Sequence, residues 1–149
     1  MTTKRLVVSV LSTVVALLTV FVAGATPASA ADPSTSFYVS GNGSIAKGNL
    51  VWHNRSVQVG GSVNSTWENN GAYVSIYPTR SDNTKLSGPY RRFVGQQLTT
   101  NYGFTMPADV VGGAHYVYVD LYVKLGSGTA YAYQGSDRCT RSGCSSYKW

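Results

Sequence analysis

Between Ala114 and Gly135 the sequence reads AHYVYVDLYVKLGSGTAYAYQG, and tyrosines alternate with aliphatic residues through most of it. A tyrosine ring offers a flat apolar surface together with a hydroxyl group that donates and accepts hydrogen bonds. Several such rings on one surface would suit sugar rings, which present both C–H faces and hydroxyl groups. Because the alternation has period two, a strand would place the tyrosines on one face and the aliphatic side chains on the other.

The number of residues in the turn decides whether the tyrosines of the two halves meet. A two-residue turn at Ser127-Gly128 would place Tyr122 opposite Tyr133. A three-residue loop would shift the pairing by one residue and turn Tyr131 and Tyr133 toward the core. Short hairpins favour two-residue turns that contain glycine. The sequence therefore predicts one outward face that carries five tyrosines, Tyr116, Tyr118, Tyr122, Tyr131 and Tyr133.

The same pattern also has a purely structural interpretation. Tyrosine is a preferred strand residue, and cross-strand aromatic pairs stabilise a sheet by roughly 0.2–1 kcal/mol each. Two alternatives therefore stay open for this face. It is either a ligand platform, to which Trp52 or Trp67 adds a further ring, or a sheet surface stiffened by its own aromatic pairs.

Residues for catalysis are sparse. His53 lies in WHNRSV before a regular strand pattern, and His115 precedes the tyrosine-rich strand, near Asp109 and Asp120 in sequence. Either histidine could act as a general base beside a carboxylate, but no nucleophile elbow, zinc-protease motif or P-loop is present. We expect no metal site and no cofactor, because the acidic residues of the mature chain stand singly, at Asp32, Glu68, Asp82, Asp109, Asp120 and Asp137.

The two cysteines of the chain, Cys139 and Cys144, enclose four residues in RCTRSGCSSY. In an oxidising compartment we expect them to form a disulfide, which the chain-entropy relation values at about 2 kcal/mol. The bond would clamp Thr140-Arg141-Ser142-Gly143 as a rigid protruding tip with one basic side chain. A preorganised loop lowers the entropic cost of docking, as in an inhibitor of an extracellular protein.

The first 30 residues have the layout of a secretory signal peptide. Lys4 and Arg5 precede an apolar run from Leu6 to Ala23, and Ala28-Ser29-Ala30 supplies the small residues of a cleavage site. An uncleaved membrane anchor is the alternative, since the run nearly reaches the length of a membrane span. Cleavage after Ala30 would leave residues 31–149 as a single secreted domain without a stable membrane span.

The charge of the mature chain is small and dispersed. Loss of Lys4 and Arg5 lowers the formal net charge from +6 to +4, and Arg91-Arg92 is the one adjacent basic pair that remains. The lack of a basic run argues against nucleic acid as a partner. Weak attraction to anionic wall polymers or membranes would fit this charge, and so would an ordinary solvated surface.

Short segments of period-two alternation run through the mature chain, separated by clusters of Gly, Asn, Asp, Ser and Pro. Gly60-Gly61, inside one such segment, predicts a bulge or the close approach of another backbone. The chain shows no heptad and no long amphipathic helix pattern. Six to eight short strands predict an all-β fold, an antiparallel β-sandwich of immunoglobulin-like or jelly-roll-like topology.

The segment WHNRSVQV, from Trp52 to Val59, resembles a stretch that recurs in small secreted actinobacterial proteins with a signal peptide and a β-rich domain. The shared pattern is an aromatic residue, then Asn-Arg-Ser-Val, then alternation. The resemblance implies export and a β-rich fold. It carries no activity, because that group has no agreed one.

These features lead to three functional hypotheses. The first is a non-enzymatic binding module that holds a polysaccharide or cell-wall polymer on the tyrosine face. The second is an extracellular inhibitor or effector that acts on another protein through the clamped loop 139–144. The third is a small hydrolase with His53 or His115 as its base. A structural surface protein would also fit, and the five tyrosines favour the binding module.

Overall fold

The computed structural model describes residues 31–66 and 69–148, so the predicted signal peptide, its cleavage site and Trp67 lie outside the described residues. No helix long and apolar enough to cross a membrane occurs among the described residues. The strands are β1 (Ser34–Gly41), β2 (Ser44–Trp52), β3 (Ser56–Asn64), β4 (Ala72–Thr79), β5 (Tyr90–Val94), β6 (Thr99–Pro107), β7 (Tyr116–Lys124), β8 (Tyr131–Thr140) and β9 (Gly143–Tyr147).

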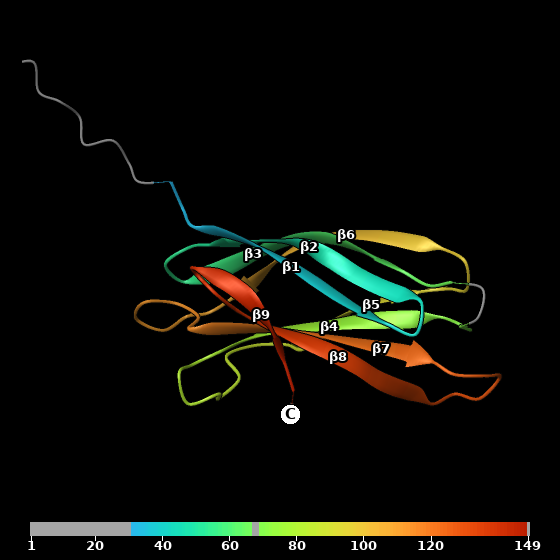
Figure 1. Cartoon of the computed structure of the whole chain (residues 1–149). Helices are drawn as coiled ribbons and strands as arrows, with labels where there is room; N and C mark the ends of the chain where they lie inside the picture. The colour runs from blue at the N-terminus through green and yellow to red at the C-terminus, as the bar shows by residue number, and fades with distance from the viewer. Residues whose placement is uncertain (1–30, 67–68, 149) are drawn as a thin grey trace, which may run out of the picture. The chain divides into compact units, whose positions relative to one another are not determined.

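The strands form two antiparallel sheets that pack face to face (Figure 1). The four-stranded sheet has the order β1-β2-β3-β6, and the five-stranded sheet has the order β5-β4-β7-β8-β9. The predicted all-β sandwich is confirmed. The order β2-β3-β6 opposite β5-β4-β7-β8 favours the immunoglobulin-like topology of the two expected, with β1 and β9 as additional edge strands.

The core lies between the sheets and is built by the alternation of side chains along the strands. In β7, Val117, Val119, Leu121 and Val123 are fully buried, as the period-two pattern predicts. The four-stranded sheet supplies facing side chains such as Leu50, Val57 and Met106. Because the aliphatic side chains of each strand pack in this core, the side chains at the alternate positions face outward.

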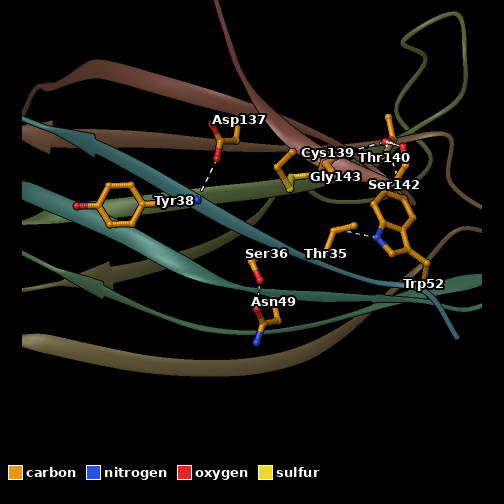
Figure 2. The surroundings of a disulfide bond; sticks show 11 residues. Thr35, Ser36, Tyr38, Asn49, Trp52, Asp137, Cys139, Thr140, Ser142 and Gly143 are labelled. Atoms are coloured by element: carbon orange, nitrogen blue, oxygen red, sulfur yellow. Dashed lines mark hydrogen bonds between the residues drawn. A yellow bond between two sulfur atoms is a disulfide. The ribbon is translucent and has the colours of Figure 1, made fainter. Parts of the chain in front are cut away.

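One region of the core contains a buried hydrogen bond and a disulfide (Figure 2). Trp52 is fully buried, and its indole Nε1 donates a hydrogen bond to Thr35 Oγ1 at 2.9 Å. The predicted bond between Cys139 and Cys144 is present and joins directly opposed residues of β8 and β9. The expectation that Trp52 extends an exposed aromatic surface is wrong, because its ring packs in the core.

The glycine pair in β3 marks a close approach of two strands rather than a bulge. The pairing of β2 with β3 runs without a register shift, and Gly48 lies opposite Gly61. A β-carbon on Gly61 would overlap the carbonyl oxygen of Lys47. The close approach predicted at Gly60-Gly61 is therefore found at Gly61, and glycine is needed there because the neighbouring backbone occupies the space of a side chain.

Candidate binding surface

The register of the β7–β8 hairpin gathers the tyrosines on one face. Tyr122 lies opposite Tyr133 and Lys124 lies opposite Tyr131, which is the register that a two-residue turn predicts. Farther along, Leu121 pairs with Gly135, so Gln134 is an extra residue that forms a β-bulge. The bulge keeps Tyr133 and Ser136 on the same outward face although their numbers differ by three.

Two strands that the sequence did not connect with the hairpin extend this surface. Tyr73 of β4 lies opposite both Phe93 of β5 and Tyr122 of β7. The ring centroids of Tyr73 and Tyr122 are 4.7 Å apart in a stacked arrangement, and those of Tyr73 and Phe93 are 4.9 Å apart. We call the four directly opposed residues of β5, β4, β7 and β8 the aromatic row: Phe93, Tyr73, Tyr122 and Tyr133.

The two ends of the aromatic row are the most accessible. Phe93 is 55% exposed and Tyr133 is 41% exposed, whereas Tyr73 and Tyr122 are partly buried between them. Tyr131 packs edge-on against Tyr73, with ring centroids 4.9 Å apart. Desolvation by burial raises the pKa of Tyr73, Tyr122 and Tyr133. These hydroxyls therefore stay neutral at physiological pH and are available as both donors and acceptors.

A second row of directly opposed residues on the same four strands is polar and consists mostly of small side chains. It contains Arg91, Ser75, Asp120 and Ser136, and we call it the polar row. Ser136 Oγ donates a hydrogen bond to Asp120 Oδ1 at 2.6 Å. The small side chains leave a depression of about 490 Å³ beside the aromatic row, also lined by Lys85 and Tyr122.

Asp120 is the buried carboxylate of this depression and is only 4% exposed. Burial raises the pKa of Asp120, although hydrogen bonds with Ser136 and Tyr77 and the charge of Lys85 partly offset the effect. The depression therefore combines the Asp120 carboxylate and the Ser75 hydroxyl with two cations, Lys85 and Arg91, and with aromatic walls. Such a mixture can hydrogen-bond polar groups of a ligand while rings cover its apolar parts.

The far end of the tyrosine face is covered. Tyr118 is fully buried, and its hydroxyl donates a hydrogen bond to Asn83 Oδ1 at 2.7 Å. Asn83 belongs to the β4–β5 loop, which folds back along the sheet, with Leu86 donating its backbone N–H to the Pro78 carbonyl. The expectation that Tyr118 is part of an exposed surface is wrong, because this loop lies over its ring.

Tyr116 is only partly exposed and belongs to a packed stack. The Arg138 guanidinium lies between the rings of Tyr116 and Tyr147, 4.9 Å from each ring centroid. Cation–π contacts of this kind hold β7, β8 and β9 together. Of the five predicted tyrosines, Tyr122, Tyr131 and Tyr133 thus lie together on the open part of the face, while Tyr116 and Tyr118 lie at its covered end.

The two histidines lie in separate surroundings. His53 Nδ1 lies 2.7 Å from Asp32 Oδ2, but the pair is at the surface, with side chains 36% and 50% exposed. His115 packs edge-on against Tyr116, with ring centroids 4.4 Å apart. In the described part of the chain no hydrogen bond or ion pair joins His115 to Asp109 or Asp120, which are partnered by Arg55 and Ser136 respectively.

The clamped tip of the β8–β9 hairpin folds against its own protein. Arg141 Nη2 donates hydrogen bonds to the carbonyl oxygens of His53 and Gly112, at 3.1 and 2.8 Å. Thr140 Oγ1 lies 2.9 Å from Ser142 Oγ within the turn. The disulfide of the expected rigid, protruding tip is present, but the side chain of Arg141 does not protrude, because it is tied back to neighbouring loops.

Comparison of the chain with protein-family models, with curated proteins and with solved structures gives no match. Residues 31–66 and 69–148 contain no group of three or more His, Cys, Asp or Glu side chains that could hold a metal ion. The surface chemistry of the sandwich is therefore the feature of this chain that bears on its function.

Sequence reasoning missed three parts of this surface: Phe93, Tyr73 with Ser75, and Arg91. A signal for β4 existed, because AYVSIYP and YVDLY both place a small residue between two tyrosines on one face. No comparable signal marked Phe93, whose position beside Tyr73 depends on which strands become neighbours.

Proposed function

We propose that the protein is a secreted, non-enzymatic binding module that holds a polysaccharide or cell-wall polymer on the outer face of the five-stranded sheet. The observation that carries this proposal is the aromatic row, four rings from adjacent strands with exposed ends, beside the polar row. Export is part of the proposal. It is supported by the signal-peptide pattern, by the resemblance of WHNRSVQV to secreted proteins and by the disulfide.

The physical fit to sugars comes from the combination of the two rows. The rings of Tyr133 and Phe93 offer apolar surface to the C–H faces of a sugar ring. Ser75, Asp120 and Arg91 offer acceptors and donors to its hydroxyls. The rings pack on one another before any ligand arrives, so little side-chain entropy remains to be lost on binding.

The direction of the row sets the path of the ligand. Neighbouring strands are about 4.8 Å apart, so four strands give a row about 14 Å long that runs across the strands. At the β8 end, Tyr133 also lines a cleft of about 710 Å³ with Tyr38, Tyr147 and Asp137. A chain lying along the aromatic row would continue into this cleft, which favours an oligomer or polymer over a single sugar.

The test is depletion of the purified mature protein by insoluble polysaccharides, with chitin, cellulose and bacterial cell-wall preparations as probes. We expect retention on at least one of them, and a loss of about tenfold or more in affinity for a Phe93→Ala/Tyr133→Ala double variant. Leu98→Ala is the matched control, since Leu98 is 59% exposed and Phe93 55% exposed. The proposal would be refuted if the wild-type protein stayed in solution with every probe, or if the double variant were retained as well as wild type.

A further inference from the structure

A basic basin lies at one end of the sandwich, away from the aromatic row. The β4–β5 loop, the β6–β7 loop and the β8–β9 turn meet there (Figure 1). The basin has a volume of about 920 Å³, the largest of the depressions described above. We define it by six of its polar lining residues, Arg55, Arg80, Asp109, His115, Arg141 and Ser142.

The charge of the basin is unbalanced. Arg55 Nη1 pairs with Asp109 Oδ1 at 2.7 Å, and among the described residues no salt bridge engages Arg80 or Arg141, although the charge of Arg80 helps to lower the pKa of Asp82. Arg80 makes hydrogen bonds in the β4–β5 loop through its backbone, and no side-chain bond of Arg80 occurs in the described part of the chain. Two guanidinium groups that form no salt bridge in the described part of the chain therefore line one concave surface.

Arg141 is held in position before any ligand binds. Its Nη2 donates to the carbonyl oxygens of Gly112 and His53, and the disulfide clamps the turn that carries it. A guanidinium has five N–H donors, so the Nη1 and Nε groups remain for a ligand. The two carbonyl contacts fix the plane of the guanidinium, and this lowers the entropic cost of a paired interaction with an oxyanion.

The loop opposite Arg141 is fixed as well. Gly113 has a φ of 72°, and a β-carbon there would meet the Asn54 carbonyl oxygen at 2.5 Å. The β6–β7 loop thus lies tightly on the β2–β3 turn and presents the Gly112 carbonyl that anchors Arg141. The basin is therefore a formed surface in which the orientation of Arg141 is determined by packing and hydrogen bonds.

We infer that the basin binds a chain that carries repeated phosphate groups. The planar guanidinium of an arginine donates two parallel hydrogen bonds to two oxygens of one phosphate. A phosphodiester is negatively charged at physiological pH, where arginine is positively charged. The basin is too large for one phosphate but holds several linked units, and Arg80 and Arg141 supply contacts for more than one of them. Sulfated and carboxylated chains are the competing occupants that the experiment separates.

The experiment is an isothermal titration of the mature protein with linear polyphosphate at physiological ionic strength. We expect saturable binding and an affinity loss of about tenfold or more in an Arg80→Gln/Arg141→Gln double variant. A Lys47→Gln/Arg92→Gln double variant removes the same charge at sites that do not line the basin and serves as the control. Absence of wild-type binding, or an equal loss in the control, would overturn the inference.

Two further measurements keep the result interpretable. Arg80→Gln alone removes no side-chain hydrogen bond, so a weakened affinity in this variant cannot reflect a loosened hairpin. Heparin and polygalacturonate, added as competitors, distinguish sulfate and carboxylate from phosphate, and competition as strong as that of polyphosphate would overturn the assignment to phosphate. The Phe93→Ala/Tyr133→Ala variant should bind polyphosphate like wild type, so this inference and the proposed function fail independently.

Discussion

The outer faces of the two sheets differ in the side chains that the alternating positions place on them. The four-stranded sheet presents Gly60, Gly103 and small polar residues such as Ser62 and Asn101, with Ser36 Oγ donating a hydrogen bond to Asn49 Oδ1 at 2.7 Å (Figure 2). Tyr38 is the one aromatic side chain on this face of the described strands. The five-stranded sheet presents the aromatic row, the polar row and the covered tyrosines.

This difference bears on the structural interpretation of the tyrosines. Both sheets bury one aliphatic face in the same core, and the four-stranded sheet does so without aromatic pairs on its outside. An outer aromatic row is therefore not a requirement for building this sandwich. The exposed ends of that row, Phe93 and Tyr133, add apolar surface in contact with water, which favours a role in binding.

The largest expected effect is on the free energy of unfolding, and it distinguishes the covered Tyr118 from the exposed Tyr38. Tyr118→Ala should lower the free energy of unfolding by about 3 kcal/mol or more, because a fully buried ring leaves a cavity. Tyr38→Ala, on the outer face of the four-stranded sheet and 57% exposed, should change it by less than about 0.5 kcal/mol. Chemical denaturation measures both values, and similar losses would contradict the assignment of Tyr118 to a packed region.

The next prediction concerns the buried carboxylate of the polar row. Because burial raises the pKa of Asp120, the unfolded chain loses this proton at a lower pH than the folded protein does. The contribution of Asp120 to stability is therefore fully present below the unfolded pKa, near pH 4, and is lost as pH rises through the folded value. Relative to Asp120→Asn, wild type should become less stable as pH rises.

Asp82 provides the control of opposite sign. The Thr84 backbone N–H donates to Asp82 and lowers its pKa, so its contribution is present at neutral pH and is lost as pH falls. Unfolding curves of Asp120→Asn and Asp82→Asn across pH should show opposite trends against wild type. A constant difference for Asp120→Asn would show that the polar row does not desolvate its carboxylate.

The smallest expected effect is a change in stability on the outer face of the four-stranded sheet. A β-carbon on Gly60 would meet nothing within 4 Å, so Gly60→Ala should stabilise the fold by about 0.5 kcal/mol through the unfolded chain. Gly61→Ala should destabilise it, since its β-carbon would overlap the neighbouring strand. Thermal unfolding compares the two, and polysaccharide retention of Gly60→Ala should equal that of wild type.

Local patterns predicted what depends on neighbours in sequence. Period-two alternation predicted the strands and the aliphatic core, the glycine-containing turn predicted that Tyr122 lies opposite Tyr133, and the spacing of Cys139 and Cys144 predicted their bond. These features follow from backbone geometry over a few residues, so they are readable without knowledge of the tertiary fold.

The remaining features depend on contacts between distant segments. Tyr118 is buried because the β4–β5 loop crosses its ring, and Arg141 is tied back because the β6–β7 loop reaches it. Phe93 joins the aromatic row because β5 pairs with β4. The periodicity of the sequence does not determine which strands become neighbours or which surface a polar loop covers. Only the part of the site on the β7–β8 hairpin could therefore be predicted.

The extra residue in β8 has a consequence for how the length of this chain can vary. Tyr122 pairs with Tyr133 on one side of Gln134, and Leu121 pairs with Gly135 on the other. If Gln134 were deleted, the strand pairs on both sides of it would keep their register. A one-residue deletion is therefore tolerable here, because the outward side chains of β8 would stay outward and the inward ones inward. What it would remove is the local twist that a bulge adds, and with it the bend of this strand beside Gly41, whose missing side chain gives Gln134 its space.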